Sequence, residues 1–328
     1  YELGSGLVGS EMCIRDRNIA VVVGILVYQL LTQEVMPLST LFNSGFNFWF
    51  LVLTLFIFAL TMFTETFRTS ILINHTSGKW RPFLSYKVSA VGRYYDVITP
   101  LATGGEPFQI LYLKNRGLSV SSAISVPMGR YVLCQLASIL MSTIVLILAA
   151  TTDIVGGVNV ISVAFYIGYA INTAICLVTI FLSISKKVGA KLVAWALKFL
   201  KKIKIVKNYD KQYNKVLKVV SDYQNTMQEF AKSKWKFVLL ALISIIQYIL
   251  QYAIPFGIVC LFLGWRPDLF LQVFIMGVMI EMAASFIPIP GGSGVSELSF
   301  TALFASLFTE GTLFWALILW RFMSYYIY

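Results

Sequence analysis

The chain has 328 residues, of which 58% are hydrophobic and 12% are charged, and its mean hydropathy is +0.78. A soluble domain is about 45–50% apolar and about 25% charged, so this composition excludes an ordinary soluble enzyme and indicates a membrane protein. The net charge is +11, but fourteen of the 26 Lys and Arg residues lie between Lys186 and Lys236. Hydrophobic segments flank this run on both sides, which favours anionic lipid headgroups over nucleic acid as its partner.

Residues 1–17 differ from the rest of the chain because they show no apolar period. The string GLVGSEMCIRDR within them resembles translated sequencing-adapter read-through, and we expect a non-native segment that packs against nothing. A short cytoplasmic tail is the alternative. Residues 18–328 form the predicted transmembrane domain. Its last segment, Leu313–Tyr328, stops inside an apolar run, which predicts truncation at that end.

Six segments are candidates for full membrane spans, each of which needs about 20 apolar residues. In chain order they are Asn18–Gln33, Phe46–Phe63, Val126–Ala150, Val163–Ile184, Phe237–Leu263 and Leu313–Tyr328. Two further segments, Phe83–Leu113 and Leu269–Phe308, are hydrophobic but interrupted by Gly and Pro. We predict a re-entrant hairpin at each of these two places, with a pair of complete spans as the alternative.

Lys and Arg residues predict the orientation because they concentrate in cytoplasmic loops. They cluster at Arg68, Lys79, Arg81 and Lys87, at Lys114 and Arg116, and in the Lys-rich run. Placing these clusters inside the cell leaves Thr151–Ser162 and Gly264–Asp268 outside. Each half then reads span, span, re-entrant hairpin, span, in opposite orientations. The sequence therefore predicts an all-α polytopic protein built from inverted repeats, the first half in residues 18–150 and the second in residues 163–328.

The Lys-rich connector, residues 186–236, carries apolar residues at alternating steps of three and four. One such series is Val206, Tyr209, Tyr213, Val216, Val220, Tyr223, Met227 and Phe230. This spacing predicts amphipathic helices. We expect a cytoplasmic helix pair whose apolar face meets the membrane or the bundle and whose lysines meet lipid phosphates. A helical hairpin that merely connects two spans is the alternative.

The two interrupted segments carry related motifs, Pro100–Glu106 (PLATGGE) and Pro288–Glu297 (PIPGGSGVSE). Irregular backbone at membrane depth is tolerated where it lines a polar cavity or is buried in protein. A matched pair in the two halves indicates a transport site. A simple turn between helices is the alternative. We expect the two glycine pairs to face each other across a polar cleft; the candidate residues of these motifs are Thr103, Gly104, Gly105, Glu106, Pro290, Gly291, Gly292 and Glu297.

Ionisable residues at membrane depth are costly and are therefore functional candidates. They are Arg93, Asp96, Glu106, Arg130, Glu281, Glu297 and Arg321. Arginine forks bind phosphate in a bidentate manner, and carboxylates bind amines. A cleft that holds both signs of charge suits a zwitterionic or aminoacylated phospholipid headgroup. A set of buried structural ion pairs in a membrane scaffold is the alternative.

The sequence contains no constellation that indicates an enzyme. There is no P-loop or dinucleotide fingerprint, and His75 is the one histidine. The four cysteines, Cys13, Cys134, Cys176 and Cys260, lack metal-ligand spacing. We therefore predict no catalytic residue, no metal and no cofactor, and the oligomeric state stays open.

The most specific segments are Gly92–Pro100 (GRYYDVITP), Thr103–Gln109 (TGGEPFQ), Tyr112–Gly117 (YLKNRG) and the second glycine motif. At these residues the chain resembles the lysylphosphatidylglycerol synthase transmembrane region, or flippase-like domain family, which also forms the N-terminal part of the multiple peptide resistance factors. The family often shows a Glu-Arg pair early in the third span. Here Gly129 precedes Arg130, so only the arginine carries over.

This resemblance implies a multi-pass protein of the bacterial plasma membrane that flips or presents aminoacylated or other polar lipids. Family members that make lysylphosphatidylglycerol carry a soluble transferase domain after the membrane part. We therefore expect a lipid translocase. The alternatives are the membrane portion of a phosphatidylglycerol lysyltransferase without its catalytic domain, and a scaffold that transports nothing.

Overall fold

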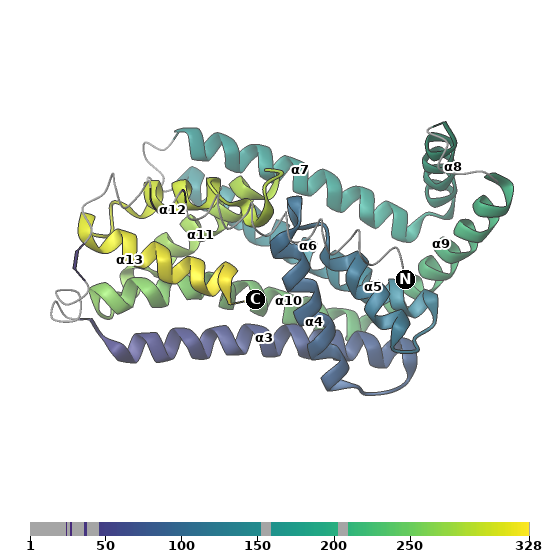
Figure 1. Cartoon of the computed structure of the whole chain (residues 1–328), viewed down its shortest axis with the longest axis horizontal. Helices are drawn as coiled ribbons and strands as arrows, with labels where there is room; N and C mark the ends of the chain where they lie inside the picture. Colours follow the sequence, from purple (N-terminus) through teal and green to yellow (C-terminus); the bar gives the residue numbers. More distant parts are fainter. Residues whose placement is uncertain are drawn as a thin grey trace.

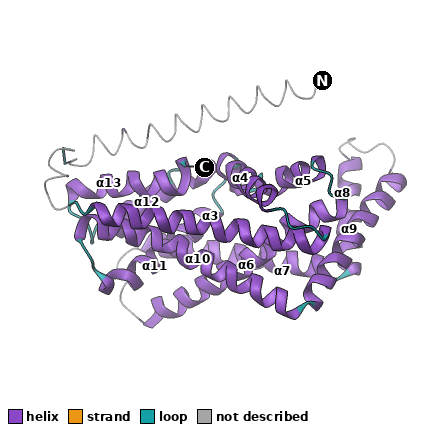
Figure 2. Ribbon diagram, turned by 90° about the horizontal axis from the view of Figure 1, so that it is seen from below, coloured by secondary structure: helices purple, strands orange, loops and turns teal. Residues whose placement is uncertain are grey.

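The computed structural model describes residues 46–151, 159–202 and 209–327, together with a few isolated positions before residue 46. The described part is helical throughout and contains no strand (Figures 1 and 2). The expected segment 1–17 and the predicted span Asn18–Gln33 lie outside the described residues, apart from two isolated positions in that span.

The first half contains a long helix, a broken pair of helices and a second long helix. These elements are α3 (Phe48–Ser77), α4 (Pro82–Ile98), the short 3₁₀ turn η1 (Pro100–Ala102), α5 (Gly105–Asn115) and α6 (Val120–Thr151). The Asn47 side chain caps α3 by accepting the Trp49 N–H at 3.2 Å. Gly78, with a φ of 66°, ends the same helix in a left-handed conformation.

The second half repeats this order after a helical connector. The connector follows α7 (Asn159–Ile184) and consists of α8 (Lys186–Lys202) and α9 (Tyr209–Lys232). The repeated series is α10 (Lys234–Leu263), the 3₁₀ turn η3 (Pro267–Leu269), α11 (Phe270–Ser285), the 3₁₀ turn η4 (Pro290–Gly292), α12 (Val295–Phe304), α13 (Glu310–Arg321) and the π-turn η5 (Phe322–Tyr326).

Five helical segments of the described part are long and apolar enough to cross a membrane. They are Phe48–Ser77, Val120–Ala149, Val160–Ser183, Lys234–Leu263 and Pro267–Ser285. Four of them coincide with predicted full spans to within two residues at the ends that fall short. The fifth is the first limb of the second interrupted segment, so this limb is long enough to cross by itself. The predicted span Leu313–Tyr328 forms α13, of 12 residues, and the five-residue turn η5.

The predicted end of the second span at Phe63 is wrong, because α3 continues to Ser77. The prediction stopped at the first charged residues. Glu65 and Arg68 are nevertheless completely buried, so they face other helices instead of water. Arg68 was also counted among the basic residues of a cytoplasmic flank, and its burial removes it from that group.

Helices α3 and α10 occupy equivalent places in the two halves and run antiparallel. The N-terminus of α3 meets the C-terminus of α10, where the Asn47 N–H donates to the Leu261 carbonyl at 3.1 Å. Further along α3, Arg68 donates to the Ser244 hydroxyl at 3.0 Å, early in α10. Both contacts agree with the path of the two helices in Figure 1. Antiparallel counterparts are what two halves of opposite direction require.

The turns η1 and η4 have the same backbone conformation and pack against each other. Each begins with a proline, and each contains left-handed residues: Leu101 and Ala102 have φ values of 57° and 50°, and Gly291 and Gly292 have 61° and 59°. The predicted pairing of Gly104-Gly105 with Gly291-Gly292 is therefore wrong in register. Leu101-Ala102 corresponds to Gly291-Gly292, and Gly104 corresponds to Gly294, because each of these two glycines precedes the next helix.

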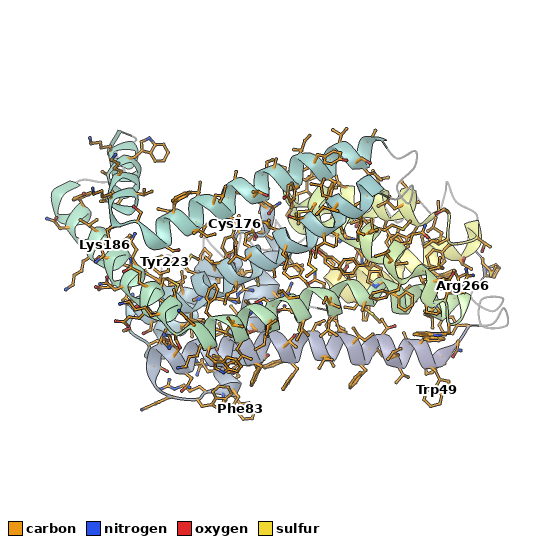
Figure 3. All side chains as sticks on the ribbon, turned by 180° about the vertical axis from the view of Figure 1, so that it is seen from behind. Trp49, Phe83, Cys176, Lys186, Tyr223 and Arg266 are labelled. Atoms are coloured by element: carbon orange, nitrogen blue, oxygen red, sulfur yellow. The ribbon has the colours of Figure 1, made fainter. Side chains whose placement is uncertain are left out.

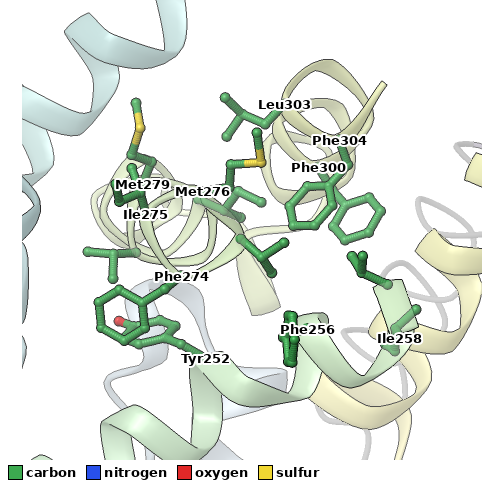
Figure 4. Packing of buried hydrophobic residues seen from close by; sticks show 14 of the residues in the cluster. Tyr252, Phe256, Ile258, Phe274, Ile275, Met276, Met279, Phe300, Leu303 and Phe304 are labelled. Atoms are coloured by element: carbon green, nitrogen blue, oxygen red, sulfur yellow. The ribbon is translucent and has the colours of Figure 1, made fainter. Parts of the chain in front are cut away.

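Most of the apolar core lies in the second half. Aromatic and Met side chains of α10, α11 and α12 meet there, among them Tyr252, Phe256, Phe274, Met276, Phe300 and Phe304 (Figure 4). Phe300 and Phe304 stack with their ring centroids 4.2 Å apart. This packing fixes α11 and α12, which flank η4, and thereby holds that turn in place.

The predicted connector helices are confirmed as α8 and α9. Tyr223 of α9 is buried, and its hydroxyl lies 2.7 Å from that of Ser183 on α7. The Gln224 side chain donates to the Leu182 carbonyl at 2.6 Å. Figure 3 shows Lys186 and Tyr223 at one end of the molecule and Arg266 at the other. The described helices of the Lys-rich connector therefore lie at one end of the helix bundle.

Candidate functional site

Two adjoining cavities lie where the two halves meet, and the larger of these two has a volume of about 390 Å³. Leu101 and Ala102 of η1 line it together with Gly291 and Gly292 of η4. A smaller cavity of about 160 Å³ adjoins it, because six residues line both: Arg93, Ala102, Tyr131, Gln135, Gln251 and Glu281. The two broken turns therefore border one polar space that both halves build.

Glu65 of α3 is the centre of the ion pairs in the first half. Its carboxylate accepts Arg93 Nε at 2.8 Å and Arg130 Nη1 at 3.3 Å. Gln247 of α10 also donates to it at 3.3 Å. A completely buried carboxylate needs such partners because desolvation otherwise disfavours its charged form. Glu65 therefore ties α3, α4, α6 and α10 together.

Arg130 joins this centre to α5. Its Nη2 atom lies 3.1 Å from Glu106 Oε1, while Nη1 contacts Glu65. The two ends of one guanidinium thus hold two carboxylates that lie on different helices. Charge-assisted hydrogen bonds of this kind are stronger than neutral ones and fix geometry.

The second half holds a related ion pair. Arg321 Nη2 lies 2.6 Å from Glu297 Oε1, and the Arg321 guanidinium also donates to the Gly291 carbonyl at 3.3 Å. The other Glu297 oxygen accepts the Gly294 N–H at 2.6 Å. Glu297 and Arg321 are 24 positions apart, as are Glu106 and Arg130. Each half therefore places a glutamate in the first turn after its broken segment and pairs it with an arginine from the following helix.

Asp96 and the glycines of the first motif shape the turn. The Asp96 carboxylate accepts the Gly105 N–H at 2.9 Å, and the Thr99 hydroxyl accepts the Gly104 N–H at 2.9 Å. A Cβ atom on Gly105 would collide with the Asp96 carboxylate. Glycine is therefore required at this position for the backbone to approach Asp96. The carboxylate also sits at the N-terminus of α5, where the helix dipole favours negative charge.

Glu281 of α11 has a different environment from the other acids. It accepts the Tyr252 hydroxyl at 2.7 Å and the Gln251 amide at 3.4 Å, and both donors are neutral. In the described part of the chain, no Lys or Arg nitrogen lies within salt-bridge distance of this carboxyl. Glu281 nevertheless lines both cavities.

The structure brings together most of the predicted site residues. Five of them, Arg93, Asp96, Glu106, Arg130 and Glu281, line the smaller cavity. Arg321, Gly291 and Gly292 line the larger one. Glu297 does not line it but forms a salt bridge with Arg321, which does. Thr103, Gly104 and Gly105 line neither cavity and serve the turn, while Pro290 is buried at the start of η4.

Sequence reasoning missed several polar residues of this region: Glu65, Arg68, Gln247, Gln251 and Tyr252. Uncharged polar residues in an apolar helix give no distinct signal. Glu65 and Arg68 could have been found from their spacing of three positions, which places both on one face of a continued helix. Within the described ranges, no group of three or more His, Cys, Asp or Glu residues could hold a metal ion.

Comparisons with known proteins agree with this membrane architecture. The chain is similar to a UPF0104 membrane protein of Archaeoglobus fulgidus, with 22% identity over 291 residues that cover 85% of this chain and 83% of that protein. No solved structure matches the chain. The profile of the lysylphosphatidylglycerol synthase TM region matches residues 7–328, a range that begins within the segment expected to be non-native. The chain therefore belongs to the lysylphosphatidylglycerol synthase TM region family and is a multi-pass membrane protein.

Proposed function

We propose that this protein translocates phospholipids by admitting their polar headgroups to the cavity between η1 and η4. The observation that carries this proposal is the shared cavity itself, because broken turns from two antiparallel halves border it and charged groups of both signs line it. Membrane transport sites are typically built at the interface of inverted repeats from interrupted helices. A polar path of this kind lowers the cost of moving a headgroup through hydrocarbon.

The charges of the cavity favour a headgroup that carries both signs. Arg93 and Arg321 line the larger cavity, and guanidinium groups match phosphate oxygens. Glu281 lines the same cavity without an arginine partner and suits an amine. Zwitterionic or aminoacylated phospholipids present both groups. The substrates proposed here are therefore lipids with a phosphate and an amine.

The Lys-rich connector supports an orientation for this activity. In the proposal, residues 186–236 lie in the cytoplasm of a bacterial cell, and Gly264–Asp268 lies outside the plasma membrane. The exposed Lys186 lies at the end of the bundle opposite Arg266 (Figure 3). Each basic residue near an anionic membrane surface contributes about 1 kcal/mol of attraction. The connector would thus hold the cytoplasmic end of the bundle against anionic headgroups.

The family name suggests a second candidate function, in which this chain is the membrane portion of a lysylphosphatidylglycerol synthase. In that case the cavity would present lipid to a transferase domain instead of moving it across the bilayer. The two candidates differ in a liposome assay, because a presenting domain without translocation leaves the two leaflets unmixed.

Translocation can be measured with phosphatidylethanolamine that carries a quenchable dye on its acyl chain, in liposomes that contain the purified protein. We expect dye from the inner leaflet to become accessible to an impermeant quencher faster than in protein-free liposomes. Glu106→Gln should slow this rate, and Asp268→Asn, at an exposed pair outside the cavity, should not. Equal rates with and without protein, for zwitterionic and anionic lipids alike, would contradict the proposal.

A further inference from the structure

We infer that Glu281 is an exchangeable proton-binding site, at which a proton and the cationic group of a headgroup compete. Its position in the wall of both cavities carries this inference. The transport consequence rests on the proposed function, whereas proton binding at this carboxyl does not.

The contacts of Glu281 separate it from every other acid of the central network. Glu65, Glu106 and Glu297 each form a salt bridge with an arginine. Asp96 lacks one but accepts a backbone N–H at the N-terminus of α5, which stabilises a negative charge. The donors to Glu281 are the neutral Tyr252 and Gln251. Glu281 is therefore the carboxyl whose negative charge is least compensated.

The charge count of the network points to one proton. Glu297 and Arg321 pair with each other and cancel. The remaining carboxyl groups are Glu65, Asp96, Glu106 and Glu281, and the remaining guanidinium groups are Arg68, Arg93 and Arg130. With every group ionised, four negative charges face three positive ones. An uncompensated charge in a low-dielectric region is costly, so the group binds a proton or admits a cation. One proton on Glu281 makes the network neutral.

The charged and titratable groups on the described elements around Glu281 leave it without a cationic partner. Those that line the two cavities with it and that carry charge or titrate are Tyr252 and Tyr248 of α10, Arg93 and Asp96 of α4, Glu106 of α5, Arg130, Tyr131 and Cys134 of α6, and Arg321 of α13. The arginines among them are already bound to other carboxylates: Arg93 to Glu65, Arg130 to Glu65 and Glu106, and Arg321 to Glu297.

The cavity next to Glu281 can also carry a proton to and from it. Polar side chains line it beside Glu281, among them Gln247 and Gln251. A polar cavity holds ordered water when space allows, and this one, with 160 Å³, has room for several molecules. A proton from bulk water would move along such water to a Glu281 oxygen, and the reverse path would return it to bulk water.

Competition between a proton and a headgroup amine at one carboxylate couples the two. When an amine enters, Glu281 releases its proton, and when the amine leaves, a proton returns. One proton then crosses the membrane in the opposite direction for each cationic headgroup. For such a one-for-one exchange, the equilibrium distribution of the lipid between leaflets shifts about tenfold for each pH unit of imposed gradient.

Infrared spectroscopy of the purified full chain in phosphatidylglycerol nanodiscs tests proton binding without transport. The C=O stretch of a protonated carboxyl should appear as the pH is lowered, and Glu281→Gln should remove it. Glu229→Gln, at an exposed position of α9, is the matched control and should leave the band of the buried carboxyl unchanged. Tyr252→Phe removes a donor to the carboxylate, so the band should persist to higher pH. A band that is unaffected by Glu281→Gln would overturn the inference.

A transport experiment separates the failure of this inference from the failure of the proposed function. Liposomes with dye-labelled phosphatidylethanolamine receive a pH gradient. The wild-type distribution should follow the gradient, whereas any lipid movement that remains in Glu281→Gln should be independent of it. Wild-type translocation that ignores the gradient would overturn the proton coupling. If the wild type moves no lipid but Glu281→Gln still removes the infrared band, the proton site stands and the translocase proposal fails.

Discussion

Glu297 and Arg321 form a salt bridge of 2.6 Å across 24 positions of the chain, the same separation that joins Glu106 to Arg130 in the first half. Each glutamate lies in the first turn of the helix that follows a broken segment, and each arginine lies on the next helix. The two halves therefore hold their interrupted segments in place by equivalent ion pairs. This equivalence extends to the left-handed residues of η1 and η4.

Removal of Arg130 should destabilise the protein more than removal of any exposed arginine. Arg130→Ala leaves the buried Glu65 with one arginine fewer and Glu106 without its partner. Breaking a buried pair from one side costs about 3–5 kcal/mol. Thermal unfolding in detergent should show a clear fall in Tm. Arg266→Ala, which breaks an exposed pair, is the control and should change Tm little; equal shifts for the two variants would contradict the central role of Arg130.

Gly105→Ala should distort the turn between α4 and α5. The new Cβ would collide with the Asp96 carboxylate and displace the hydrogen bond that Asp96 accepts. Overpacking of this kind costs about 1–3 kcal/mol. Gly129→Ala is the matched control, because its Cβ would meet neighbouring side chains at an ordinary distance of 3.5 Å. A loss of stability in the control and not in Gly105→Ala would show that this turn is not constrained as described.

Leu101→Gly should raise the stability of the protein. Leu101 has a φ of 57°, which an L-residue adopts at a cost of about 1–2 kcal/mol, and its side chain is 46% exposed, so its loss removes little packing. The reverse change at the equivalent place, Gly291→Ala, should destabilise, because φ is 61° and a Cβ would collide with Tyr325. A lower Tm for Leu101→Gly than for the wild type would refute the left-handed conformation at this position.

Cysteine labelling tests the orientation. Asp268, which pairs with Arg266, and Lys187, which follows Lys186, are both exposed. Figure 3 shows Arg266 and Lys186 at opposite ends of the molecule, so Asp268→Cys and Lys187→Cys report on the two ends. An impermeant reagent added to intact cells should label Asp268→Cys and leave Lys187→Cys unmodified until the membrane is opened. The reverse pattern would invert the proposed topology and place the Lys-rich connector outside the cell.

Sequence reasoning reached the architecture because two signals agreed. The distribution of Lys and Arg predicted a repeated order of elements, and the Gly/Pro motifs marked where each half is broken. Neither signal gave the register. The left-handed positions of the first half fall on Leu101 and Ala102, which no propensity marks, so glycine matching aligned the motifs incorrectly.

The centre of the ion-pair network was missed for a related reason. The span that contains Glu65 was ended at the first charged residues, on the assumption that charge marks the water interface. That assumption fails for Glu65, because α4, α6 and α10 bury it and supply its partners. This burial depends on tertiary packing, which the local sequence around Glu65 does not reveal.

The most direct test of the central claim is to fill the shared cavity and measure lipid movement. Leu101→Cys, in a chain with Cys134→Ser, places a thiol on the wall of the larger cavity. Phe83→Cys, at a side chain that is 83% exposed and lines neither cavity, is the matched control. After reaction with a bulky charged maleimide, Leu101→Cys liposomes should translocate lipid no faster than protein-free liposomes, while modified Phe83→Cys should keep the rate of the unmodified protein. An unchanged rate in fully modified Leu101→Cys would contradict passage of headgroups through this cavity.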